Sequence, residues 1–99
     1  MILGKVIGTV WSTKKDENLV GAKFLIVQEL NLDYSPKKNT VVAVDSVGAG
    51  VGEVVLVAQG SSARQTILTK NKPIDAVIMA IVDKLDISVK DKIEKVVEN

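Results

Sequence analysis

The chain has 99 residues, of which 46% are hydrophobic and 25% charged, and this composition is typical of one ordinary globular domain. Its 13 Lys and Arg against 12 Asp and Glu give a net charge of +1, which does not favour a polyanionic partner such as nucleic acid. It has no Cys and no His, which excludes disulfides, Cys/His zinc sites, cysteine nucleophiles and His-dependent triads. The sequence shows neither a bilayer-spanning apolar run nor a secretory signal, so we expect a cytoplasmic protein without membrane contact.

Strand-forming residues dominate the pattern along the chain. More than a quarter of the residues are Val or Ile, whose branched side chains favour strands. Gly4 and Gly8 fall on one face of the first predicted strand, which indicates the close approach of a neighbouring backbone. Apolar stretches bounded by polar and glycine-containing turns predict five strands, over residues 2–12, 23–30, 40–46, 53–59 and 76–87.

Two helices complete the predicted elements. A short helix over residues 61–68 precedes the last strand, with Ser61 or Ser62 as its N-cap. A second helix covers residues 88–99, where Ser88 and Asp91 form a capping pair. A helix of this length is marginal alone, so it docks either on its own barrel or on a neighbouring subunit. Its apolar stripe comprises Val89, Ile93, Val96 and Val97.

These elements predict an all-β fold: a small five-stranded, OB-like barrel with a short helix before the last strand and a C-terminal helical extension. Residues 1–87 form the barrel domain, and residues 88–99 form the amphipathic helical tail. The predicted strands are apolar on both faces, whereas one barrel has one interior. Obligate self-association would cover the second face, and the alternative is burial under the loops and helix of the same chain.

Two glycine- or serine-containing segments superficially match catalytic or cofactor motifs. The segment from Gly48 to Glu53 fails as a dinucleotide fingerprint, because its last required glycine is a glutamate and a strand follows instead of a helix. The segment from Gly60 to Arg64 fails as a nucleophile elbow, because its final position is Arg64 and no histidine is available as a base. The sequence therefore predicts no catalytic residue, no cofactor and no metal site.

The order of several segments resembles one known family. The first two read GKVIGTVWST over residues 4–13 and LVGAKFLIVQ over residues 19–28. They are followed by VAVDSVGAGVGE over residues 42–53, GSSAR over residues 60–64, PIDA over residues 73–76 and IVD over residues 81–83. Together they closely resemble the bacterial microcompartment vertex family, the EutN/CcmL type, over roughly residues 1–87. Residues 88–99 look like an extension beyond the shared part.

The resemblance implies a non-catalytic shell protein that assembles as a homopentamer and closes the vertices of a polyhedral bacterial microcompartment shell tiled by hexameric shell proteins. A ring of five supplies the five-fold points that a flat sheet of hexamers lacks, and its interface would cover the second apolar strand face. A nucleic-acid-binding barrel would need a basic, aromatic-rich face, and an enzyme would need a base or metal cluster; neither is visible. The resemblance places these residues at the subunit interface or near the five-fold axis: Gly48, Ala49, Gly50, Gly52, Glu53, Ser61, Ser62 and Arg64.

Overall fold

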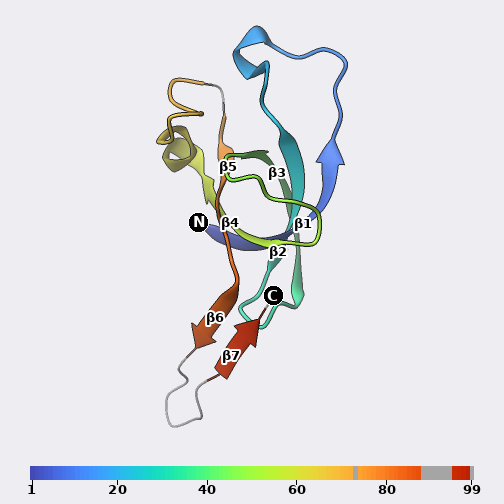
Figure 1. The fold of residues 1–99 in the computed structure, drawn as a ribbon, viewed down its shortest axis with the longest axis vertical. Helices are drawn as coiled ribbons and strands as arrows, with labels where there is room; N and C mark the ends of the chain where they lie inside the picture. The colour runs from blue at the N-terminus through green and yellow to red at the C-terminus, as the bar shows by residue number, and fades with distance from the viewer. Residues whose placement is uncertain (73, 88–94, 99) are drawn as a thin grey trace.

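The computed structural model describes residues 1–72, 74–87 and 95–98. Five strands close a barrel (Figure 1), which confirms the predicted all-β fold. Neighbouring strands pair antiparallel, except for the parallel pair of β3 and β5. Around the barrel the strands follow the order β1 (Ile2–Val10), β2 (Phe24–Leu30), β3 (Pro36–Asp45), β5 (Ala76–Ile81) and β4 (Val54–Gln59).

Short elements connect and extend the barrel. The predicted helix before the last barrel strand is present as a single 3₁₀ helix, η2 (Gly60–Arg64), and another 3₁₀ turn, η1 (Glu17–Leu19), lies in the first long loop. The strand predicted over residues 76–87 is divided in two, β5 and β6 (Lys84–Ile87). The division lies at Val82 and Asp83. The backbone N–H of Val82 still donates to the carbonyl of Val54, and β6 then leads away from the barrel (Figure 1).

The predicted C-terminal helix is wrong over residues 95–98, which form strand β7 (Lys95–Glu98). This strand pairs antiparallel with β6, with Leu85 opposite Val97 and Asp86 opposite Val96. The helical spacing of the apolar residues was a misleading signal, because a short isolated helix is marginal whereas β6 offers backbone partners to a β-branched segment. The rest of the predicted helix, residues 88–94 and 99, lies outside the described residues.

A β-bulge at Ile7 divides β1 into two parts with opposite orientation. Val6 pairs with Val27 and the next paired residue, Gly8, with Ile26, so Ile7 is an extra residue on this strand. The two predicted glycines therefore do not share a face. Only Gly4 lies where a neighbouring backbone approaches closely: a Cβ built on it would be 2.9 Å from the carbonyl oxygen of Gln28.

The chain itself covers part of its second apolar face. The barrel interior is filled mainly by small and β-branched side chains, among them Val6, Val27 and Val55. A second cluster forms where η2 packs over Val44 and Val77, and a third gathers Leu3 and its neighbours near the start of β6. Burial under the chain's own loops and η2 thus accounts for part of this face. Exposed apolar side chains remain on three barrel strands, namely Ile7, Val42 and Met79.

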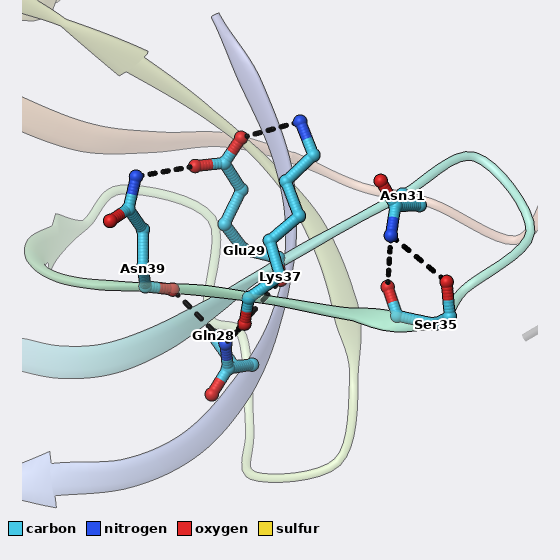
Figure 2. A network of polar contacts seen from close by, with 6 residues as sticks. All are labelled: Gln28, Glu29, Asn31, Ser35, Lys37 and Asn39. Atoms are coloured by element: carbon cyan, nitrogen blue, oxygen red, sulfur yellow. Dashed lines mark hydrogen bonds and ion pairs between the residues drawn. The ribbon is translucent and has the colours of Figure 1, made fainter.

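Side-chain amides and one ion pair hold the irregular end of the β2–β3 hairpin (Figure 2). The register shifts after Gln28, and its amide nitrogen donates to the carbonyls of Lys37 and Asn39, which binds the bulged part of β3 to β2. Lys37 also forms an ion pair of 3.1 Å with Glu29, and the Asn39 amide donates to the same carboxylate. The hydrogen bond with Lys37 is the main cause that holds the pKa of Glu29 below its ordinary value.

Candidate subunit interface

The glycine-rich turn between β3 and β4 is fixed at its start by Asp45. One carboxylate oxygen of Asp45 accepts hydrogen bonds from the backbone N–H groups of Val47, Gly48 and Ala49, at 3.1 to 3.2 Å. Ala49 is 1% exposed and belongs to the main core of the barrel, so the turn closes over the interior. The Ser46 hydroxyl donates to the carbonyl of Ile78 on β5, which fixes the turn to a second strand.

The far end of the turn is joined to β1. The Gly52 N–H donates to the carbonyl of Val6 at 2.8 Å, and the Val6 N–H donates to the carbonyl of Glu53 at 2.9 Å. The Glu53 carboxylate accepts from the Gly50 N–H at 2.7 Å. These bonds make the turn a rigid part of the barrel instead of a loose loop.

The glycines of this turn differ in backbone conformation. Gly48 and Gly52 have φ values of 78° and 95°, a region that other residues seldom adopt. Gly50 has no positive φ, and a Cβ built on it meets only a carboxylate oxygen of Glu53 at 3.5 Å, an ordinary contact. Packing and backbone geometry within the single chain therefore do not require a glycine at position 50.

The second predicted segment is η2, which lies against the ends of β4 and β5. Ala63 is fully buried between these strands, whereas Ser61 and Ser62 are exposed. Arg64 is exposed as well, and its guanidinium donates to the carbonyl of Ile74 at 3.1 Å. η2 thus presents two hydroxyls and one cation on the surface of the barrel.

The two segments are separate patches of one subunit. The glycine turn is bonded to β1 and to the middle of β5, while η2 packs at the beginning of β5, where the Gly60 N–H donates to the carbonyl of Asp75. A ring of identical subunits needs two different surfaces on each copy, because every interface joins one surface to the other. Separate patches suit that requirement.

Several surface features were missed by the sequence analysis. Trp11 is 90% exposed at the end of β1 and lines an open concavity with Phe24 and Lys15. The loop after η2, expected to be partly helical, holds a buried threonine, Thr69, and the exposed apolar residue Ile67. The exposure of Ile67 and the burial of Thr69 reverse the usual pattern, and the sequence carries no signal for this because burial depends on how the loop packs.

Over the described part of the chain, no group of three or more acidic side chains is arranged to hold a metal ion. No helix within residues 1–72, 74–87 and 95–98 is both long and apolar enough to cross a bilayer.

Comparison with known proteins gives consistent matches. The sequence profile described as "Ethanolamine utilisation protein EutN/carboxysome" matches residues 1–83. The bacterial microcompartment shell vertex protein GrpN of Rhodospirillum rubrum is 51% identical over 86 residues, which cover 87% of this chain and 97% of GrpN. Among solved structures, a carboxysome subunit, CcmL, superposes with a TM-score of 0.85 at 45% identity, covering 89% of this chain and 92% of that one. The structure of GrpN, described as a pentameric microcompartment shell protein, has a TM-score of 0.81 at 50% identity, covering 89% of this chain and all of that one.

Proposed function

Because this chain belongs to the EutN/CcmL family, we propose that it is a structural protein of a bacterial microcompartment shell, in which five copies form a ring that closes a vertex. One observation carries the proposal: the barrel matches the whole length of a pentameric shell protein at 50% identity. A flat layer of hexamers becomes a closed polyhedron only if five-fold points are introduced. In this proposal the flanking tiles are hexameric shell proteins, and the ring performs no chemistry.

The predicted interface residues suit this role either because they are exposed or because they hold the glycine turn rigid. Ser61, Ser62 and Arg64 are exposed on η2 and so are available for contact with a second copy. Gly50 has no requirement inside its own chain, and a neighbouring backbone close to the turn would give it one. Gly48, Ala49, Gly52 and Glu53 act by holding the turn rigid, so that its surface is already in place before assembly.

The first test is the mass of the purified protein by light scattering coupled to size exclusion. Five copies of a 10.6 kDa chain give about 53 kDa, and this is the mass we expect. A stable monomer would contradict the ring, and a hexamer would contradict the vertex role while leaving self-association intact.

A glycine variant tests where the copies meet. Gly50→Ala should fold normally, because the nearest atom to its added Cβ is 3.5 Å away, and Gly50→Leu, whose folding is checked by circular dichroism, should fail to form the ring. Lys38→Leu is the matched control, because it adds the same side chain at an exposed position of β3 without touching the turn. If both leucine variants assemble like the parent, the glycine turn does not lie at the interface.

The vertex role itself is tested by co-expression with hexameric shell proteins. With the parent chain we expect closed polyhedral shells in electron micrographs, and with Gly50→Leu we expect open or elongated assemblies. Closed shells in the complete absence of the chain would show that the vertices do not need it.

A further inference from the structure

The loop that follows η2 is held rigidly by its own hydrogen bonds. Thr69 is completely buried, and its hydroxyl donates to the carbonyl of Ala63 and shares a hydrogen bond with the Thr66 hydroxyl. The Lys70 N–H donates to the carbonyl of Thr66 at 2.9 Å, and the Lys72 N–H to that of Thr69 at 3.1 Å. A loop with this many internal bonds projects from the barrel in one defined shape.

The tip of this loop is apolar. Ile67 is 102% exposed, so it makes essentially no contact with its own chain, and Leu68 beside it is 41% exposed. Isolated exposed apolar residues are common, but two adjacent ones on a hydrogen-bonded loop form a contact element whose backbone is already ordered before binding. The flanking Lys70 is exposed and gives the tip a basic rim.

The same chain has an apolar groove on another part of its surface. β3 and β5 pair only at Val44 with Val77 and Asp45 with Ile78, so the two segments diverge before these positions. A cavity of about 230 Å³ lies there, and Val42 on its wall is 52% exposed. The groove is lined by Phe24, Val42, Val44, Ile74, Asp75 and Ala76.

The loop after η2, which carries the apolar tip, and the apolar groove lie on different sides of β5. In Figure 1 the loop after η2 is on one side of the beginning of β5, and β2 and β3 are on the other. The full exposure of Ile67 shows that the tip does not occupy the groove of its own chain. An apolar tip and an apolar groove on separate surfaces are the two halves of a head-to-tail contact. Repeated head-to-tail contacts form a closed ring when the rotation between neighbouring copies divides a full turn evenly.

We propose that Ile67 and Leu68 of one copy insert into the Phe24–Val42 groove of the next copy around the ring. The charges agree, because the tip is flanked by Lys70 and the groove wall includes Asp75. The projection also continues directly from η2, so it extends the interface proposed above over a longer part of the chain. This inference rests on the proposed ring and specifies how neighbouring subunits fit together.

Paired cysteines test the contact, since the chain has no cysteine of its own. In Ile67→Cys/Val42→Cys, oxidation should link each subunit to the next, because a disulfide forms only when the two Cβ atoms come within about 4.5 Å. We expect a reducible ladder that ends at five chains on a denaturing gel. Ile67→Cys/Leu32→Cys is the matched control, with its second cysteine at an exposed position in the β2–β3 loop, and should give at least about tenfold less linked product.

The possible outcomes separate this inference from the ring itself. A pentameric mass without cross-linking would overturn the tip-in-groove contact and leave the ring intact. A disulfide confined to single chains would also overturn it, because the tip would then reach its own groove. A monomeric parent protein would overturn the proposed function instead.

A charge variant gives an independent measurement. Ile67→Asp leaves the fold undisturbed, because the side chain contacts nothing within its chain. We expect it to raise the protein concentration at which the ring dissociates by at least about tenfold, since it places a charge in an apolar groove. An unchanged dissociation concentration would overturn the proposal.

Discussion

Replacing Gly4 by alanine should destabilise the barrel, and by much more than the same replacement at Gly8 in the same strand. Gly4 is buried opposite Val55 on one side and Glu29 on the other. A Cβ at this position would lie 2.3 Å from the Cγ1 of Val27 and 2.9 Å from the carbonyl oxygen of Gln28. Neither atom can move easily, because Val27 is fully buried in the core and the carbonyl belongs to the β2 backbone.

The loss of stability expected for Gly4→Ala is the difference between two opposing contributions. Overpacking a well-filled core costs about 1–3 kcal/mol, and a contact of 2.3 Å with a fixed side chain belongs at the upper end of that range. Alanine offsets about 0.5–1 kcal/mol of this, because glycine loses more backbone freedom on entering a strand. The net loss of about 2 kcal/mol corresponds to a decrease in Tm of roughly 10 °C for a domain of this size.

Thermal unfolding followed by circular dichroism at one protein concentration measures the difference, since Tm depends on concentration in an oligomer. Gly8→Ala is the control in the same strand: its added Cβ would meet the Cδ1 of Ile26 at 3.4 Å and the Cβ of Ile26 at 3.9 Å, and no backbone atom. We expect Gly8→Ala to melt close to the parent. If the two variants melt within about 3 °C of each other, the close approach of β1 and β2 at Gly4 is not as described.

Three further predictions concern polar contacts and the C-terminal strands. Because the hydrogen bond with Lys37 lowers the pKa of Glu29, its stabilising contribution is complete at neutral pH and is lost as the pH falls through that lowered pKa. Lys37→Met should raise the pKa of Glu29 in an NMR titration, and an unchanged value would contradict the contact. Thr69→Val should cost about 1–3 kcal/mol in urea unfolding, since it leaves the carbonyl of Ala63 without its buried donor, and a neutral effect would refute this. Truncation after Ile87 should leave a folded, somewhat less stable barrel by circular dichroism, because among the described strands β7 pairs with β6 and not with the barrel. Complete unfolding would contradict the predicted division at that residue.

The sequence alone was sufficient to predict the barrel strands and the family. Val and Ile in short runs, separated by polar or glycine-containing turns, favour strands wherever they are placed, so all five barrel strands were predicted. Two of them differ in their bounds, because β3 already begins at Pro36 and β5 already ends at Ile81. The segment from Gly48 to Glu53 was recognisable as a turn, because alternating glycines supply the positive φ values found at Gly48 and Gly52. These are local properties, and a local pattern determines them.

The assignment of residues to the interface is a prediction from the resemblance, and the structure adds only their surroundings. The exposure of Ser61, Ser62 and Arg64 and the burial of Ala49 depend on which elements pack beside them. The apolar tip at Ile67 was not predicted, because the sequence pattern favoured a helix there. Hydrogen bonds of Thr69 to residues three and six positions earlier form the loop instead.

Pairing between strands determined the bulge in β1 and the conformation of residues 95–98. The bulge at Ile7 reverses the orientation of Gly8 relative to Gly4, and alternation along the sequence cannot reveal an extra residue that only the partner strand defines. The apolar residues within 95–98 fit the spacing of a helix in the sequence, yet this segment forms a strand because β6 provides the backbone hydrogen-bond partners. The sequence determines which segments are apolar and β-branched, whereas their register, their partners and the faces they bury depend on hydrogen bonds between residues distant along the chain.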